Sequence, residues 1–255
     1  MVTLGWRRCA ELERIALISD IHGNPVALDA VLEDIESGGA DRTVCLGDVS
    51  ATGPAPLYTL KTLRSRDITI VMGNTDERIM RPEAGKFNSS RDREIEKVDV
   101  WCSSLLGEQE RKFISSFSPV ISEDTEAGGI LYYHGSPRSS TEVIDSSSSE
   151  EFLGEVFSSS DADICAGGHT HVQMLRRFGH MTLINPGSVG LPYRVGRNGR
   201  HFRPVIAEYA IMELRKGEFT VDFRKVGYDI SELKEAVESS GMPEASWWLS
   251  KWKTE

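Results

Sequence analysis

The chain has 255 residues, of which 39% are hydrophobic and 27% charged, a composition typical of a globular protein and not of a disordered one. Its formal net charge is −10 at pH 7, so it offers no broad basic face for nucleic acid, and local cations must hold any phosphate ligand. The longest apolar stretches, such as 15–18, fall far short of the roughly 20 residues that span a bilayer. Since no apolar segment follows Arg7 and Arg8, we expect no secretory signal and a cytoplasmic protein.

Short apolar runs alternate with amphipathic stretches along the first part of the chain. Helical spacing of apolar residues predicts helices over 26–36 and 56–66. The apolar runs expected to form buried strands are 15–19, 43–46, 68–72, 130–133, 163–166 and 181–184. This order predicts a layered α/β domain. Two later β-rich runs, 205–214 and 218–226, predict a hairpin.

We expect one domain over residues 1–255, with its core at 14–228. The polar segment 77–127 has apolar residues at helical spacing, which predicts a helical cap insertion beside Asn74. Residues 229–255 are expected to form a C-terminal helix and a tail rich in tryptophan that docks on the domain. The chain has no CxxC pair, and Cys45 and Cys165 lie in apolar segments, so we expect reduced, buried thiols.

Side chains that can bind metals follow five of the predicted strands. They are Asp20 and His22, Asp48, Asn74, His134, and the pair His169 and His171. Ligands of open α/β sheets collect beyond the carboxyl ends of strands, so these residues are expected to converge. In extended chain, residues i and i+2 point to the same side, which would let each DxH or HxH pair grip one cation. Three oxygen donors and four imidazoles therefore predict a metal site.

Some polar residues of these loops also have purely structural interpretations. Asn24 precedes Pro25, which is typical of a helix N-cap, and this interpretation weighs evenly against a substrate contact. Asp76 could cap a helix or turn the chain. His180 and His201 lie in polar surroundings and are expected to be solvated. Structural roles do not explain the ordered set DxH, GD, GN, H and GHxH, each member of which follows a strand.

This ordered set resembles the calcineurin-like metallophosphoesterase superfamily over residues 15–190, and the runs 19–24 and 185–190 resemble its small bacterial and archaeal phosphodiesterase branch. The resemblance implies an α/β (α+β) fold, a four-layer αββα sandwich of two mixed sheets with a small helical cap insertion and a two-metal centre between the sheets. It assigns Asp20, His22 and His171 to one metal, Asn74, His134 and His169 to the other, and Asp48 as the bridge. Of these, Asp48, His22 and Asn74 are also the expected catalytic residues.

Two divalent transition-metal ions are the expected cofactors. Mixed imidazole and carboxylate donors suit manganese, which we favour, and also iron, zinc, nickel or cobalt. A pair of such ions can activate water at neutral pH and hold the attacking and leaving oxygens in line. No serine or cysteine nucleophile is then needed.

One position departs from the pattern of many superfamily members, which carry histidine after the GN dipeptide where this chain has Thr75. A hydroxyl cannot act as a general acid at neutral pH, and loss of such a group costs about 10² to 10⁴ in rate. We therefore expect substrates whose leaving groups depart as stabilised anions, namely diesters or phosphoanhydrides. The expected substrate-binding residues are Asn24, Thr75, Arg138 and Arg194, with Arg197 as a further candidate.

The sequence therefore predicts a metal-dependent phosphoesterase acting on small molecules, such as nucleotide-type or aryl diesters and dinucleoside polyphosphates. The expected partner is a small phosphorylated substrate, with no membrane and no long nucleic acid, and a homo-oligomer is allowed. The alternative is a non-catalytic, metal-binding interaction subunit of the same fold. Donor-competent side chains at all seven metal-contacting positions favour the enzyme, and Thr75 disfavours a protein phosphatase.

Overall fold

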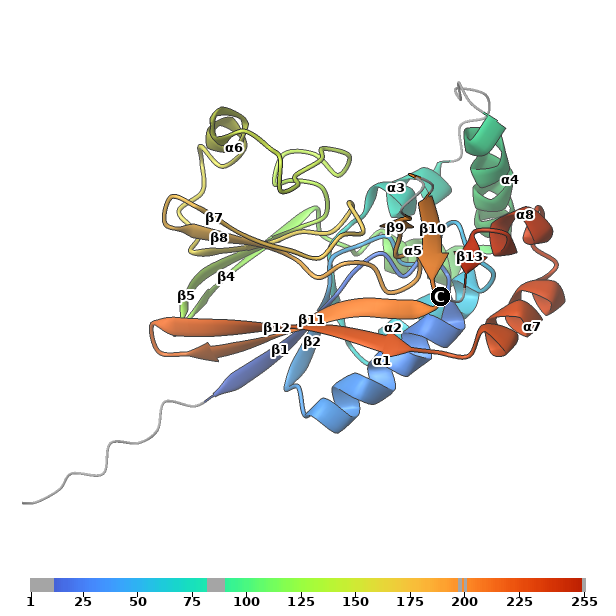
Figure 1. Cartoon of the computed structure of the whole chain (residues 1–255), viewed down its shortest axis with the longest axis horizontal. Helices are drawn as coiled ribbons and strands as arrows, with labels where there is room; N and C mark the ends of the chain where they lie inside the picture. Colours follow the sequence, from blue (N-terminus) through green and yellow to red (C-terminus); the bar gives the residue numbers. More distant parts are fainter. Residues whose placement is uncertain (1–11, 82–89, 197–198, 200, 254–255) are drawn as a thin grey trace, which may run out of the picture.

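The computed structural model describes residues 12–81, 90–196, 199 and 201–253, and its strands form two five-stranded mixed sheets (Figure 1). The first sheet has the order β12 (Glu218–Gly227), β11 (Ile206–Arg215), β1 (Glu13–Ile18), β2 (Arg42–Cys45) and β3 (Thr69–Ile70). The second has the order β4 (Val120–Thr125), β5 (Gly128–Tyr133), β6 (Ile164–Ala166), β8 (Met181–Asn185) and β7 (Met174–Phe178). In each sheet three neighbouring strands are parallel, and every other pair of neighbouring strands is antiparallel.

Three apolar cores separate four layers of secondary structure. In β1, Ile15 and Leu17 face the core between the sheets, whereas Ala16 and Ile18 face the helices on the outer side. That outer core includes residues of α1 (Pro25–Gly38) and α2 (Pro56–Ser65). The third core lies between the second sheet and α6 (Glu150–Val156). The alternation of strand side chains thus buries both faces of each sheet, and the αββα prediction is confirmed.

The segment 77–127 is only partly helical. The structure describes α3 (Asn74–Met80), α4 (Ser90–Leu105) and α5 (Glu108–Ile114) in and beside it. The prediction of a wholly helical insertion is wrong at its end, because 120–125 forms β4 and pairs with β5 through a tight turn. The exposure of β4 side chains alternates along the strand, so its period is two and not the helical 3.6.

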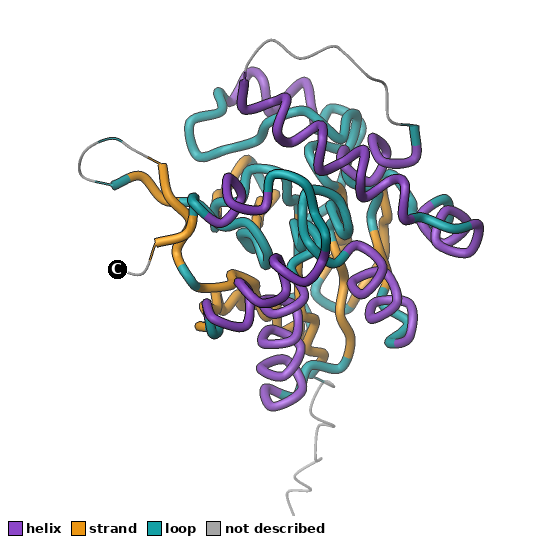
Figure 2. The backbone as a smooth tube through the Cα atoms, turned by 90° about the vertical axis from the view of Figure 1, so that its right-hand side faces the viewer, coloured by secondary structure: helices purple, strands orange, loops and turns teal. Residues whose placement is uncertain are grey.

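The C-terminal elements return to the first part of the domain. They are α7 (Ile230–Ser240), α8 (Ala245–Leu249) and β13 (Trp252–Lys253), which joins β10 (His201–Pro204) and β9 (Arg194–Val195) in a small third sheet that the sequence did not predict. Figure 2 views this side of the molecule and shows helices gathered over it. Trp248 is fully buried, and its Nε1 donates a hydrogen bond to the Thr52 carbonyl. The predicted docking of the tail is confirmed at this residue.

Two smaller predictions are also settled by the described residues. Cys45 and Cys165 are free and buried, as expected. Cys102 is also free and buried, and Cys9 lies outside the described part of the chain. No helix within that part is both long and apolar enough to cross a membrane.

Candidate metal centre

The predicted ligands converge where the carboxyl ends of the parallel strands of both sheets meet. Asp20 and His22 follow β1, Asp48 follows β2, and Asn74 begins α3 just after β3. His134 follows β5 of the second sheet, and His169 and His171 follow β6. Backbone hydrogen bonds tie the loops together, including those from Asp20 N to Gly47 O and from Gly168 N to His134 O.

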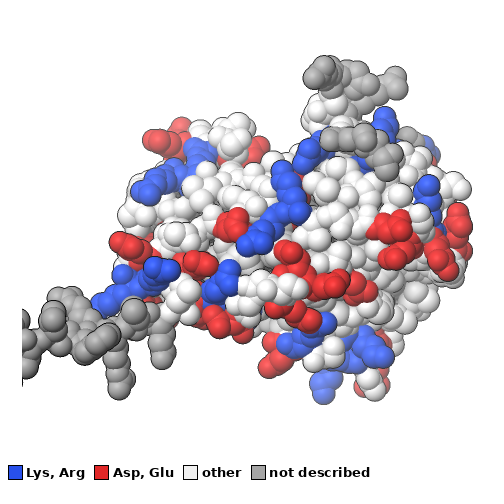
Figure 3. All heavy atoms as spheres, turned by 60° about the horizontal axis from the view of Figure 1, so that its bottom comes forward, with Lys and Arg blue, Asp and Glu red and all other residues white. Residues whose placement is uncertain are grey.

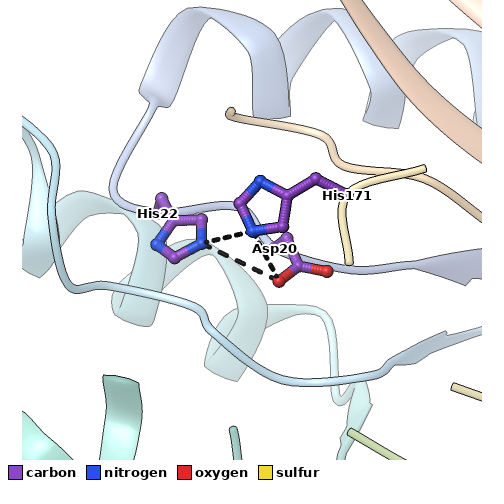
Figure 4. Close-up of side chains that lie close together, drawn as sticks. All are labelled: Asp20, His22 and His171. Carbon is purple, nitrogen blue, oxygen red and sulfur yellow. Dashed lines mark hydrogen bonds and ion pairs between the residues drawn. The ribbon is translucent and has the colours of Figure 1, made fainter. Parts of the chain in front are cut away.

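The first cluster consists of Asp20, His22 and His171 (Figure 4). The Nε2 atoms of the two imidazoles lie 3.2 Å apart. Asp20 Oδ1 lies 3.1 Å from His171 Nε2 and 3.8 Å from His22 Nε2. Three potential ligand atoms from loops of two sheets thus point at one another, an arrangement that could hold a metal ion.

The second cluster lies around His134. Its Nε2 is 3.0 Å from Asn74 Oδ1, and its ring centroid is 5.2 Å from that of His169. Asp48 joins the two clusters, because its Oδ1 lies 3.4 Å from His134 Nε2 and its Oδ2 lies 3.5 Å from His22 Nε2. Each carboxylate oxygen of Asp48 therefore faces one cluster.

Backbone carbonyls orient three of the imidazoles from the opposite side of the ring. Nδ1 of His134 lies 2.7 Å from Leu46 O, Nδ1 of His171 lies 2.7 Å from Leu191 O, and Nδ1 of His22 lies 3.2 Å from Ala51 O. A carbonyl can only accept, so Nδ1 carries a proton, and an imidazole that gives up its Nε2 proton would present that nitrogen's lone pair to the cluster. This is the tautomer that a metal ligand requires.

Asp76 holds the loop of Asp48 and confirms its predicted structural role. It is fully buried, and its carboxylate accepts hydrogen bonds from the backbone N–H groups of Asp48, Val49 and Gly73. Burial and the nearby charge of Asp48 raise the pKa of Asp76 to about 7. Because Thr75 N donates to Asp48 Oδ1 as well, both the backbone and the carboxylate of Asp48 are held in place.

The clustered charges shift the pKa values of the buried groups. Burial acts to raise the pKa of Asp20, but the nearby histidines, the charge of His171 foremost, together outweigh it and hold that pKa well below its usual range. Burial acts to lower the pKa of His134, yet Asp48 raises it to about 10. In the metal-free chain, a protonated His134 would therefore supply part of the positive charge that a bound cation would otherwise provide.

The donor set fits divalent cations. Asp20 Oδ1 is buried and makes no hydrogen bond of acceptable geometry, although it faces two imidazole nitrogens. A buried carboxylate oxygen without a partner is costly, and a cation would satisfy it. The mixed nitrogen and oxygen donors are those that divalent transition metals prefer.

The backbone of the ligands differs from the extended conformation that the sequence suggested. Five of the seven have positive φ, namely Asp20, His22, Asp48, His169 and His171, with values between 48° and 68°. The left-handed region disfavours residues with a Cβ, so five such residues in one site indicate a backbone constrained for function. As a result, His169 and His171 do not share one side, because His169 lies beside His134 and His171 beside His22.

Comparison with known proteins settles the family. The model of the calcineurin-like phosphoesterase superfamily domain matches residues 14–217. The chain belongs to this superfamily. It is 29% identical over 251 residues to the uncharacterized protein MJ0912 of Methanocaldococcus jannaschii, which covers 92% of this chain and 95% of the relative.

Two crystal structures resemble this calcineurin-like phosphoesterase over nearly their whole length. A metallophosphoesterase from Sphaerobacter thermophilus has a TM-score of 0.73 and 26% identity, covering 94% of this chain and 97% of the other. The hypothetical protein PH1004 from Pyrococcus horikoshii OT3 has the same TM-score at 17% identity, with coverage of 93% and 96%, and shows the fold alone. Membership of the superfamily supports phosphoesterase activity in general, and the clustered Asp and His residues support binding of divalent metal.

A cavity of about 610 Å³ opens beside the clusters of this phosphoesterase. Its walls include side chains of both clusters, Thr75, and residues that sequence reasoning missed, which are Thr52, Arg78, Ile95, Leu191, Tyr193, Phe202, Arg203, Trp247 and Lys251. His201 also lines it, although it was expected to be merely solvated. Four of these ten residues come from β10 and α8, whose position against the site has no signal in the sequence.

The predicted substrate-binding residues are divided by the structure. Thr75 lines the cavity. Asn24 is fully buried, accepts a hydrogen bond from Ala27 N at the start of α1 and donates one to Gly190 O. Its N-cap interpretation is therefore confirmed, and it is not among the cavity-lining residues. Arg138 is exposed outside the cavity lining and forms a two-pronged ion pair with Glu142. Arg194 lies in β9 near Glu208, also outside the lining, and Arg197 lies outside the described residues.

Proposed function

We propose that this calcineurin-like phosphoesterase hydrolyses phosphodiester or phosphoanhydride bonds of small molecules with two divalent transition-metal ions, manganese foremost. Asp20, His22 and His171 would hold one ion, and Asn74, His134 and His169 the other. The observation that carries the proposal is the position of Asp48, whose two carboxylate oxygens face different clusters. When bound, such ions supply Lewis-acid activation of water and of the phosphoryl group.

Thr75 supports the proposal that the substrates are diesters or phosphoanhydrides and not alkyl monoesters. It lines the cavity beside Asn74, and its buried hydroxyl has no hydrogen-bond partner among the described residues. A threonine hydroxyl can donate to a phosphoryl oxygen but cannot protonate a leaving alkoxide at neutral pH. Esters and anhydrides whose leaving groups are stable anions are therefore the better substrates.

The size of the cavity and the surface charge support a small substrate. A volume of about 610 Å³ is that of a small-molecule site. On the face drawn in Figure 3, lysine and arginine are interspersed with aspartate and glutamate and form no continuous basic track. A long nucleic acid would need such a track along its backbone.

A screen with the manganese-loaded protein tests this function. It would compare hydrolysis of an aryl diester, a dinucleoside polyphosphate, a cyclic nucleotide and an alkyl monoester. We expect metal-dependent turnover of at least one of the first three and slow turnover of the monoester. The Asp48→Asn variant should lose at least about 100-fold in kcat/KM, since even ligand-supporting residues are typically worth 10- to 100-fold.

The alternative of a non-catalytic, metal-binding scaffold makes the opposite forecast. A chain that binds two equivalents of manganese yet turns over none of these substrates would support the scaffold. Faster hydrolysis of the alkyl monoester than of the aryl diester would instead contradict the proposed preference for diesters and phosphoanhydrides.

A further inference from the structure

The cavity beside the metal-ligand clusters is cationic although the whole chain carries a net charge of −10. Arg78, Arg203 and Lys251 line it, and Asp48 is the sole carboxylate among its described lining residues. Asp48 itself faces the two histidine clusters and is engaged there. The remainder of the cavity is thus suited to an anionic group apart from the one at the clusters.

Arg78 is held in this cavity by a buried carboxylate of α4. Its Nε donates to Asp99 Oδ2 at 2.8 Å, and its Nη2 pairs with the same oxygen. The other oxygen, Asp99 Oδ1, accepts from Thr52 Oγ1 at 2.8 Å. Asp99 is only 3% exposed, so the pair is partly shielded from water and fixed in orientation, unlike a surface ion pair.

The position of Arg78 along α3 relates it to the metal-ligand clusters. It follows Asn74 by four residues, so both lie on one face of the helix, about 6 Å apart along its axis. The Arg78 side chain is 32% exposed, and Nη1 has no hydrogen bond within the described part of the chain. Asp99 therefore occupies one edge of the guanidinium, and the rest of it is available one helical turn from the clusters.

We propose that Arg78, oriented by Asp99, binds a second phosphoryl group of the substrate, next to the phosphoryl group at the clusters. This inference rests on the proposed function and narrows it to phosphoanhydrides, because a diester with a single phosphate has nothing to place there. Lys251, whose Nζ lies 5.0 Å from the centre of the Trp247 ring in the same cavity, supplies a second cation. Asp99 is a positioning residue, and through it α4 of the insertion takes part in substrate selection.

The competing explanation is a purely structural ion pair between α3 and α4. A buried carboxylate needs a partner, and an arginine can fill that role without touching substrate. The two explanations differ in one respect. A structural pair affects all substrates alike, whereas a second phosphate subsite affects only substrates that carry a second phosphate.

The test compares two substrates in the manganese-loaded protein, bis(4-nitrophenyl) phosphate with one phosphate and diadenosine tetraphosphate with several. For Arg78→Ala we expect kcat/KM for the polyphosphate to fall at least about tenfold, the usual effect of losing a charge-assisted hydrogen bond, and that for the diester to change less than about threefold. Arg78→Lys should lie between, because an ammonium cannot be held by the same planar fork. Asp99→Asn should show the same split between substrates with a smaller loss.

Arg66→Ala provides the matched control. Arg66 pairs with Glu36 on the surface and is not among the cavity residues, so both substrates should be turned over as by the wild type. Equal losses on the two substrates in Arg78→Ala, or no loss on either, would overturn the subsite.

Failure of the proposed function would be recognised separately. If the wild type hydrolyses no substrate, the affinity for imidodiphosphate, measured by calorimetry, still shows whether Arg78 forms a phosphate subsite. Tighter binding by the wild type than by Arg78→Ala, at least about tenfold, would support it. Equal affinities would overturn it.

Discussion

His22 and His171 are separated by 149 positions in the sequence, yet their Nε2 atoms lie 3.2 Å apart. Each belongs to a loop that leaves a different sheet, and a backbone carbonyl fixes the opposite nitrogen of each ring. Two lone pairs held this close repel each other unless a proton or a cation lies between them. The contact is therefore best explained as part of a metal-ligand set that also includes Asp20.

Replacing His171 by alanine should remove one metal ion and leave the other. We expect the metal content to fall from about two ions per chain to about one, because the cluster around His134 is built from other residues. Metal analysis after dialysis measures this directly. His180→Ala is the matched control, since His180 is exposed and lies just before the start of β8, away from the clusters. Unchanged metal content in both variants would contradict the assignment of His171 as a ligand.

Gly73→Ala should displace the Asp48 carboxylate through steric overlap alone. A Cβ at Gly73 would lie 2.2 Å from Asp48 Oδ1 and 2.3 Å from Asp48 N, although the backbone φ of −89° suits any residue. We expect a loss of about 1–3 kcal/mol in the free energy of unfolding, together with weaker metal binding. Urea unfolding of the metal-free protein measures the first effect. Gly38→Ala, where a Cβ would meet nothing within 4 Å, should be neutral or slightly stabilising.

Thr75→Ala should separate catalysis from stability. The Thr75 hydroxyl has no partner in the described structure, and the N–H that supports Asp48 belongs to the backbone and survives the substitution. We expect an unchanged melting temperature but a fall in kcat/KM of about tenfold, the effect of one lost hydrogen bond to a charged substrate. Thr75→Ser should restore activity. A lower melting temperature with unchanged kinetics would indicate a structural role instead.

The metal-free protein should become less stable as the pH rises above neutrality. Despite its burial, His134 has its pKa raised to about 10 by Asp48, from an ordinary value of 6.5. The stabilisation from its bound proton is complete below pH 6.5 and is lost as the pH rises through about 10. Thermal unfolding in the presence of a chelator should show this decline, and His134→Gln should reduce it. A melting temperature that rises over this range would contradict the assignment.

The same titration governs metal uptake. A ligand imidazole must lose its proton before it can bind a cation, so binding at neutral pH should release protons and strengthen as the pH rises. Calorimetry in buffers of different ionisation enthalpy measures the number released. Binding that releases no proton at pH 7 would show that His134 is neutral there.

Local sequence patterns were sufficient to predict the strands that carry the ligands. Each of these strands is a short apolar run that ends in a polar motif, and the rule that ligands gather at carboxyl ends of strands correctly brought Asp48 and His134 together. The Asn24 N-cap was equally visible, because capping depends on residues that adjoin in the chain. Residues 120–125 were predicted to be part of a helical insertion but form a strand, because their pairing with β5 is a tertiary contact.

The sequence by itself determined which side chains could bind metal and at which strand ends they stand, because residue type and hydrophobic period are local properties. The spacing of His169 and His171 alone placed them on one side of the chain, although the family resemblance already assigned them to different metals. The tertiary structure shows them beside different clusters, because the surrounding loops hold both residues in the left-handed region. The tertiary structure also places Arg78, and not the predicted Arg138, in the cavity lining. The position of Arg78 depends on its ion pair with Asp99 of α4. The orientation of a long, charged side chain is fixed by partners distant in the chain, and no local pattern records them.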